Sequence, residues 1–321
     1  MVLGIDTSNY TTSVAVVSDG MIVSDRRRLL EVREGQRGLR QQEALFQHMG
    51  NLPVLYRDVL DDIGDLGVSG IDAVACSVRP RPVDGSYMPV FMAGKSFAEV
   101  IAATLNVPLY EFSHQEGHAE AASKGTLLEG EESYVFFHLS GGTTEAVSLP
   151  EYELCGRTLD ISFGQLIDRV GVALGMKFPC GKEMDGLAMN ADKDLSRDLS
   201  SKSCIPAVKV CSGDVNLSGT ESACQRSIAG GLVRDNACFC RDLFDVIAET
   251  LWKMTLSIKE KTGKDRFLFA GGVSSSLYIR GRLEEKCKGT DIVLEFGEPD
   301  LCRDNAVGIA LLGEEKWRLN L

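Results

Sequence analysis

Residues 2–17 read VLGIDTSNYTTSVAVV, and residues 134–149 read YVFFHLSGGTTEAVSL. Each stretch has a short apolar run, a polar turn of Ser, Thr, Asn or Gly, and a second apolar run, which is typical of a β-hairpin. One such hairpin alone would be ordinary. Two copies, each followed by further predicted strands and helices, indicate a duplicated α/β unit.

The remaining apolar runs and helical periodicities extend this plan along the chain. The predicted strands outside the two hairpins cover residues 21–23, 71–76, 107–110, 266–270 and 292–296. The predicted helices cover residues 39–64, 92–105, 163–175, 183–190, 222–230, 234–261, 276–287 and 304–319. We therefore expect two lobes, residues 1–112 and residues 113–303, with a closing helix at 304–321 that packs back on the first lobe.

The composition limits the possible partners. Lys and Arg total 34 against 46 Asp and Glu, which gives a net charge of -12 and argues against autonomous binding to RNA, although a local basic patch or a basic partner stays open. No apolar stretch reaches the ~18 residues that a membrane helix needs. The ten cysteines are scattered without a CxxC pair, and Met1–Asp6 opens directly as a strand. We expect a soluble, cytoplasmic protein with reduced thiols.

The polar turns have the composition of phosphate-binding turns, because successive backbone N–H groups can surround an anion. Gly residues between a strand and a helix also let a ligand approach the backbone closely, although each turn alone could be a simple connector. The candidate residues in the turns are Thr7, Ser8 and Asn9, then Ser140, Gly141, Gly142 and Thr143, and finally Gly271, Gly272 and Ser276.

Charged side chains add further candidates. Arg79 and Arg81 lie in a proline-rich loop, and guanidinium groups suit phosphate or carboxylate ligands, although a plain surface loop is the alternative. Asp168 and Asp185 lie on predicted helices that could line the same cleft, whereas acids on helices are normally just solvated.

His114 and His118 are the strongest metal-ligand candidates. Four residues apart on a helix, their imidazoles share one face, and they are two of only four histidines in the chain. Two surface histidines remain the alternative interpretation. His138, at the end of a strand, and Asp304, at the start of the last predicted helix, are further candidate ligands, although an Asp there also suits a helix N-terminus. Three or four N and O ligands suit zinc, iron or manganese.

In this order, the motifs resemble the TsaD-type tRNA threonylcarbamoyladenosine transferase family, which was historically named O-sialoglycoprotein endopeptidase (glycoprotease, peptidase family M22). The resemblance runs from residue 2 to about residue 312. The motifs that carry it are Gly4–Ser8, His114–His118, Ser140–Glu145, Asp160–Ala188, Asn216–Gly219, Gly271–Val273 and Cys302–Asn305.

The resemblance implies a two-lobed fold of the actin/sugar-kinase/Hsp70 class (ASKHA, ribonuclease H-like), with duplicated α/β domains around a nucleotide cleft. The family reaction transfers a threonylcarbamoyl group from its adenylate to adenosine 37 of tRNAs that read codons starting with A. The implied partners are therefore an adenine nucleotide or adenylate, tRNA, and a TsaB-like or other protein.

The resemblance also implies site residues. A divalent metal, with zinc or iron first and manganese or magnesium as alternatives, is implied on His114, His118 and Asp304. His138 stands where some members have a metal-binding Tyr. The residues implied to contact the adenine nucleotide are Asp168, Gly181, Asp185 and Gly272.

Two segments and two single residues depart from the family pattern. Residues 9–12 read Asn-Tyr-Thr-Thr where members have Cys-Asp-Glu-Thr, and residues 79–82 read Arg-Pro-Arg-Pro instead of a Gly-Pro-Gly segment. Cys180 replaces a Gly and Ser276 replaces an Asn. These changes indicate a divergent paralogue that does not perform the standard tRNA reaction by itself. A non-catalytic nucleotide-binding partner or scaffold is the alternative, and a metallopeptidase is a weaker one, because the chain has no HExxH motif.

Overall fold

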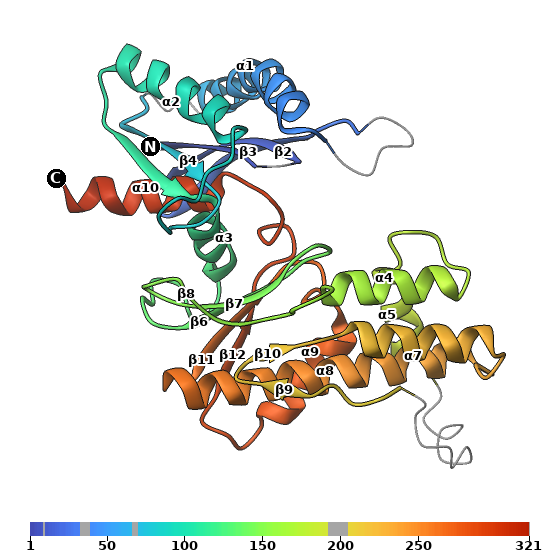
Figure 1. Cartoon of the computed structure of the whole chain (residues 1–321). Coiled ribbons are helices and arrows are strands. Elements are labelled where there is room, and N and C mark those ends of the chain that lie inside the picture. Colours follow the sequence, from blue (N-terminus) through green and yellow to red (C-terminus); the bar gives the residue numbers. More distant parts are fainter. Residues whose placement is uncertain (9, 33–38, 66–69, 192–204, 321) are drawn as a thin grey trace. The chain divides into compact units, whose positions relative to one another are not determined.

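The computed structural model describes residues 1–8, 10–32, 39–65, 70–191 and 205–320 (Figure 1). The chain divides into two compact units, Met1–Lys124 with Asp300–Leu321, and Gly125–Pro299. The helix that follows residue 113 lies in the first unit, whereas the expected limits at residues 112 and 303 place it in the second lobe. No helix among the described residues is long and apolar enough to cross a membrane.

The first unit is built on a five-stranded sheet in the order β3-β2-β1-β4-β5. The three strands β1 to β3 pair antiparallel, as the hairpin pattern predicts, and β4 and β5 continue the sheet in parallel with β1. The strands are β1 (Val2–Thr7), β2 (Thr11–Ser18), β3 (Met21–Leu29), β4 (Ala73–Arg79) and β5 (Leu109–Ser113).

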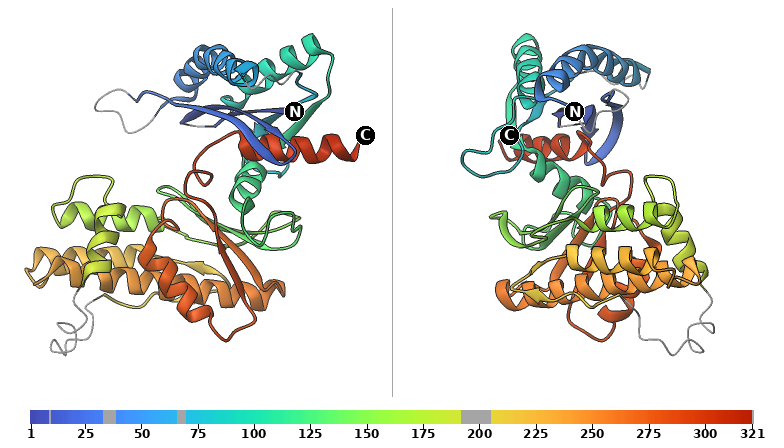
Figure 2. Two further views of the ribbon diagram at one scale, coloured as in Figure 1. Left: turned by 180° about the vertical axis from the view of Figure 1, so that it is seen from behind. Right: turned by 45° about the vertical axis from the view of Figure 1, so that its right-hand side comes forward.

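Helices cover both faces of this sheet, which explains why every residue of β1 is buried. Helices α1 and α2 lie on one face of the sheet and α10 lies on the other (Figure 2). Apolar side chains of β1, β2 and β4 pack against both layers. The helices of this unit are α1 (Gln41–Asp65), α2 (Phe91–Leu105), α3 (His114–Ser123) and α10 (Val307–Leu319).

The second unit repeats the strand plan. Its sheet has the order β8-β7-β6-β11-β12, again with an antiparallel hairpin followed by parallel strands, and β8 was not predicted from the sequence. The strands are β6 (Val135–Leu139), β7 (Thr144–Ser148), β8 (Glu153–Arg157), β11 (Arg266–Ala270) and β12 (Val293–Phe296), with a small hairpin of β9 (Val210–Cys211) and β10 (Asp214–Val215). The helices are α4 (Phe163–Ala173), α5 (Gly181–Asn190), α7 (Ser218–Ala229), α8 (Asn236–Thr262) and α9 (Leu277–Cys287).

The last helix begins later than its sequence pattern predicts. Helix α10 starts at Val307, so Asp304 lies in the preceding loop and not at the helix N-terminus. The physical reason is Asn305, whose side-chain oxygen accepts hydrogen bonds from the backbone N–H groups of Val307 (2.9 Å) and Gly308 (3.4 Å). The Asp304 carboxylate is therefore not needed to cap α10.

Glycines allow α10 to lie very close to α3 and β1. A Cβ atom on Gly308 would lie 1.9 Å from the carbonyl oxygen of Gly117 in α3, and one on Gly4 of β1 would lie 2.5 Å from the carbonyl oxygen of Ala306. Such distances are far below van der Waals contact, so no larger residue fits without moving the backbone. The segment before α10 is thereby held beside the start of α3.

We predict that Gly308→Ala destabilises the protein by about 1–3 kcal/mol, because the added methyl group must push α10 away from α3. Urea unfolding followed by circular dichroism measures the effect. Gly50→Ala is the matched control: Gly50 lies inside α1 of the same unit with open space around its Cβ position, so that variant should be neutral or slightly more stable. Equal stability of the two variants would contradict the prediction.

Candidate functional site

His114 and His118 occupy one face of α3 as the spacing predicts. Ser113 at the end of β5 caps the helix: its hydroxyl accepts from the N–H of Glu116 (3.2 Å), and the Glu116 carboxylate accepts from the N–H of Ser113 (2.6 Å). This reciprocal cap fixes the direction of the first turn. The two imidazole rings lie edge to face, with their centroids 4.2 Å apart.

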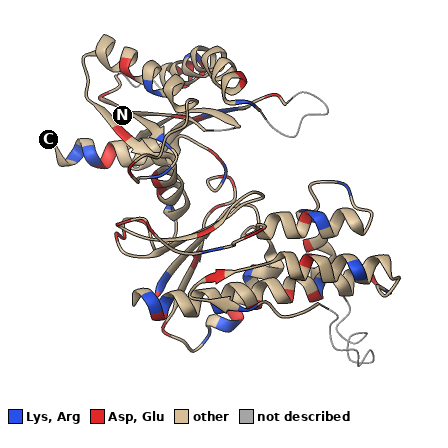
Figure 3. Ribbon diagram, in the orientation of Figure 1, with Lys and Arg blue, Asp and Glu red and all other residues tan. Residues whose placement is uncertain are grey.

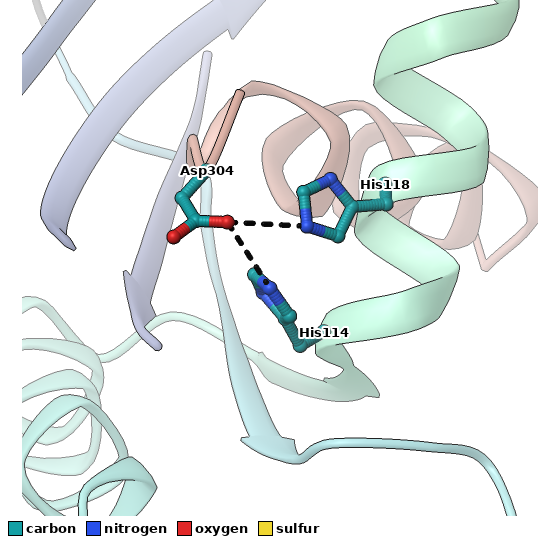
Figure 4. A group of neighbouring side chains, drawn as sticks. All are labelled: His114, His118 and Asp304. Carbon is teal, nitrogen blue, oxygen red and sulfur yellow. Dashed lines mark ion pairs between the residues drawn. The ribbon is translucent and has the colours of Figure 1, made fainter. Parts of the chain in front are cut away.

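Asp304 approaches both histidines from the loop before α10 (Figure 4). Its Oδ1 lies 3.3 Å from Nε2 of His118 and 3.6 Å from Nε2 of His114. One ligand atom from each residue lies within 4.8 Å of the others, and these three form the candidate metal cluster among the described residues. The structure thus brings together three of the four predicted ligands. The fourth, His138, lies on β6 in the second unit.

Asp6 of β1 contacts His114 through the ring nitrogen that faces away from Asp304. The Nδ1 atom of His114 lies 2.9 Å from Oδ1 of Asp6, a fully buried carboxylate whose Oδ2 has no hydrogen-bond partner among the described residues. With a proton on Nδ1, the ring presents Nε2 toward Asp304, which is the arrangement of a metal-ligating histidine with a supporting carboxylate. The role of Asp6 was not predicted from the sequence, although a carboxylate inside an otherwise apolar strand could have indicated it.

The charges in this cluster depend on one another. Burial alone would lower the pKa of His114, but the carboxylates of Asp6 and Asp304 raise it to about 10. Burial would raise the pKa of Asp304, and its contacts with His114 and His118 instead hold that pKa well below its usual range. The two carboxylates therefore stabilise positive charge at this position, and in the metal-free protein the protonated His114 ring supplies that charge.

Thr11 and His48 extend the polar surroundings and were not predicted. The Thr11 hydroxyl donates to Oδ2 of Asp304 (3.4 Å), which leaves Oδ1 directed at the histidines. The next residue, Thr12, shares a hydrogen bond with Nδ1 of His48 (2.8 Å) and accepts one from Asn51 (3.1 Å), both on α1. His48 is fully buried, and burial lowers its pKa. The sequence feature that could have indicated His48 is a histidine on the apolar face of a predicted amphipathic helix.

The remaining candidates in the first unit have different surroundings. The Thr7 hydroxyl is buried, donates to the carbonyl of Val90 (3.0 Å) and accepts from the N–H of Gly94 (3.1 Å), so it holds the start of α2. Ser8 is buried, its hydroxyl lacks a hydrogen-bond partner among the described residues, and Asn9 lies outside them. Arg79 and Arg81 are exposed, on either side of Pro80, whose carbonyl accepts from the N–H of Gln115 in α3 (3.0 Å).

In the second unit, the two glycine-containing turns lie side by side because β6 and β11 pair in parallel. The Val273 N–H donates to the carbonyl of Leu139 (3.0 Å), and a Cβ atom on Gly271 would lie 2.4 Å from that oxygen. The first turn is closed by hydrogen bonds of 2.9 Å between Ser140 and Thr143. The three glycines Gly141, Gly142 and Gly272 are exposed, with open space at the position of a Cβ atom.

Asp168 and Asp185 contact the backbone near these turns. Oδ1 of Asp168 accepts from the N–H of Cys180 (2.8 Å), directly before Gly181 begins α5. Asp185, one turn further along α5, accepts from the backbone at the start of α9. The predicted nucleotide-contacting residues therefore gather at one end of the second sheet, where both acids hold helix starts.

Comparison with known proteins adds family evidence. A family model described as TsaD, tRNA N6-adenosine threonylcarbamoyltransferase, matches residues 30–311. The tRNA N6-adenosine threonylcarbamoyltransferase of Neorickettsia sennetsu is 30% identical over 99% of this chain and 94% of its own length. The protein of the same name from Thermosipho africanus is 27% identical with the same coverage.

A similar fold occurs among solved structures. The ROK hexokinase from Thermus thermophilus aligns over 99% of both chains with a TM-score of 0.55 and 14% sequence identity, a level that concerns the fold alone. The likeness to a sugar kinase, together with the repeated strand order of the two units, confirms the expected actin/sugar-kinase/Hsp70 fold class.

We predict that His114 stays protonated at neutral pH in metal-free protein, and that Asp6→Asn lowers its pKa. Because the folded pKa is about 10 against 6.5 for a free imidazole, this interaction stabilises the fold fully below pH 6.5 and is lost as the pH rises through 10. Titration of the histidine ring signals by NMR measures this. His48 is the internal contrast, since its pKa is lowered. A His114 signal that titrates near 6.5 in both proteins would contradict the prediction.

Proposed function

This chain belongs to the TsaD family of tRNA N6-adenosine threonylcarbamoyltransferases, and we propose that it is a metal-dependent transferase. We propose that its donor is a threonylcarbamoyl or similar carbamoyl-type adenylate, and its acceptor adenosine 37 of tRNA. The observation that carries the proposal is the cluster of His114, His118 and Asp304, since a hexokinase-like fold by itself calls for no such ligand set.

The donor set fits a divalent metal. Two imidazole nitrogens and one carboxylate oxygen are typical ligands of iron(II) and zinc and leave further coordination positions open, and manganese or magnesium are the other candidates. A metal bound there would supply Lewis acidity toward a carbonyl oxygen of the donor. The chain's own residues prepare the site: Asp6 fixes the tautomer of His114, and Thr11 fixes the rotation of the Asp304 carboxylate.

An adenine nucleotide is the ligand we propose for the second unit. The open glycines Gly141, Gly142 and Gly272 support it, because a phosphate or ribose can approach a backbone that carries no side chain. The neighbouring hydroxyl groups of Ser140 and Thr143 add polar atoms to the same turn. Gly181 begins α5, and its backbone N–H is among those a helix start leaves available.

A protein partner is part of the proposal. The net charge is -12, and the Lys and Arg of the described residues are distributed over many elements, with one run of three at Arg26–Arg28 in β3 (Figure 3). Tyr10 and Thr11 stand where family members carry acids, and the Thr11 hydroxyl is bonded to Asp304. We infer that the reaction on tRNA requires a partner, such as a TsaB-like protein. The same substitutions favour the second candidate function, a nucleotide-binding scaffold without chemistry of its own.

We predict that His118→Ala and Asp304→Ala each abolish stoichiometric metal binding, because two ligands cannot hold the ion as three do. Protein reconstituted separately with iron(II), zinc, manganese and magnesium is desalted and analysed by inductively coupled plasma mass spectrometry. His138→Ala tests the fourth candidate ligand: retained metal leaves three protein ligands, and lost metal adds His138 to them. The proposal fails if the wild type retains none of the four metals, or if His118→Ala and Asp304→Ala keep the metal.

We predict that the chain restores threonylcarbamoyladenosine in a strain that lacks its own TsaD but keeps the other proteins of the modification system, a result that would contradict the interpretation of the chain as a divergent paralogue. Mass spectrometry of tRNA nucleosides measures this. The purified chain alone, given the adenylate and tRNA, should form little product, because the partner is missing. Failure to restore the nucleoside by a protein that binds metal normally would instead favour the scaffold function.

A further inference from the structure

The loop that follows β4 begins directly beside the helix that carries the candidate histidines. Arg79 is the last residue of β4 and pairs in the sheet with Ser113, the residue before His114. The carbonyl of the next residue, Pro80, accepts from the N–H of Gln115 in the first turn of α3 (3.0 Å). The backbone at Arg79 is therefore fixed next to the first turn of α3.

The alternation of β4 indicates the face of the sheet on which Arg79 lies. Cys76 and Val78 pack with the core under α1 and α2, whereas Ala75 packs with the core under α10. Because side chains of a strand alternate between the two faces, Arg79 lies on the α10 face. The side chain is exposed, and its guanidinium makes no hydrogen bond or ion pair within the described part of the chain. It is therefore available to a ligand.

The same loop carries a second arginine and an exposed tyrosine. A proline follows each of the two arginines and disfavours a helical backbone at both. The N–H of Arg81 donates to the Ser86 hydroxyl (3.0 Å), which keeps the neighbouring Tyr87 near Arg81, and Tyr87 is 64% exposed. The segment ends at Phe91, whose ring centroid lies 6.0 Å from that of His114. The loop thus starts and ends beside the candidate metal cluster.

The other segments that reach the cluster carry a further arginine and a further tyrosine. Arg303 directly precedes Asp304, and its ion pair with Asp300 spans 3.8 Å between two exposed side chains, so it restrains the guanidinium only weakly. Tyr10 directly precedes Thr11, whose hydroxyl donates to Asp304, and Tyr10 is 43% exposed. All of these residues belong to the first unit, so three guanidinium groups and two aromatic rings flank the cluster.

The cluster is open to a ligand on this side, and the surrounding charge is mixed. The side chains of His114 and Asp304 are 19% and 31% exposed. Asp84 lies in the same loop as the two arginines, and Asp300 lies near Arg303. Long-range attraction of an anion is therefore small, and a ligand would be held by close contacts with the guanidinium groups and the rings.

We propose that Tyr10, Arg79, Arg81, Tyr87 and Arg303, here called the aromatic-basic rim, receive a single-stranded RNA loop. The guanidinium groups contact phosphates of the nucleotides that flank the acceptor adenosine, and the tyrosine rings stack on neighbouring bases. A small anionic acceptor would use the guanidinium groups and leave both exposed rings without a role. This inference rests on the proposed function and names the surface that holds its acceptor.

The experiment measures RNA binding by the full chain. The labelled anticodon stem-loop of a tRNA that reads codons starting with A is titrated with protein, and fluorescence anisotropy is recorded across about 50 to 200 mM KCl. We expect Arg79→Ala, Arg81→Ala and Arg303→Ala each to weaken binding and to reduce the slope of log affinity against log salt by about 0.7.

The tyrosine variants separate stacking from charge. Tyr10→Leu and Tyr87→Leu should each weaken the stem-loop about tenfold without changing the salt slope, because a stacked base is lost and no charge is removed. Tyr87→Phe keeps an aromatic ring and should bind as the wild type does. A duplex RNA of the same length, which has no unpaired bases, should bind more weakly than the stem-loop.

Arg57→Ala is the matched control for the arginines. Arg57 is an exposed residue of α1, which covers the opposite face of the sheet, so its loss should change neither the affinity nor the salt slope. The five rim side chains are exposed, so all variants should keep the Tm and the metal content of the wild type.

Several results would overturn the inference. They are a wild type that does not bind the stem-loop at the lowest salt, equal affinity for the duplex, or an equal loss in Arg57→Ala. If the arginine variants bound the stem-loop normally but lost binding of inorganic phosphate in calorimetry, the rim would serve a small anionic acceptor. A chain that binds the stem-loop through the rim but does not restore threonylcarbamoyladenosine would refute the proposed reaction and leave the RNA surface in place.

Discussion

The close approach of three backbone segments in the first unit determines where the candidate ligands lie. Helix α10 contacts α3 at Gly308 and Gly117, and its preceding turn contacts β1 at Gly4. Because backbone contacts of this kind leave little freedom, the loop before α10 has a defined path, and Asp304 arrives beside His114. These glycines have no functional side chain, but their close backbone contacts position the residues that could bind the metal.

The cluster around Asp6 is a costly arrangement for a structural core. Removing a carboxylate from water is unfavourable even when it is paired, and a well-packed apolar group is often at least as stabilising. Here Asp6 is fully buried with one oxygen bonded to His114 and the other without a partner among the described residues. The buried carboxylate of Asp6 is therefore better explained by its orientation of the candidate ligand His114 than by stabilisation of the sheet.

Local sequence patterns were sufficient to predict part of the fold and part of the candidate site. The two hairpins follow from alternating apolar and polar runs, and the pairing of His114 with His118 follows from helical spacing, since both depend on neighbours in sequence. The contacts of Asp6 with His114, Thr11 with Asp304, and Asp185 with the start of α9 join segments far apart in the chain, so a local pattern can mark an unusual residue such as Asp6 but cannot name its partner. Strand β8 was not predicted because its sequence, Glu-Leu-Cys-Gly-Arg, has charged ends and a Gly and lacks an alternating or continuous apolar run.

The first unit is made of two pieces of chain, Met1–Lys124 and Asp300–Leu321, and the whole second unit is inserted between them. During synthesis on the ribosome, the early strands therefore emerge long before α10, which covers one face of their sheet. Domains generally fold in the order in which they are made. In this chain the inserted second unit can therefore finish folding before the first unit. Until α10 is made, the sheet of the first unit has one apolar face uncovered. The three ligands meet only after the whole second unit and Asp304 have been translated, so assembly of the centre is a late event relative to synthesis of the sheet that carries it.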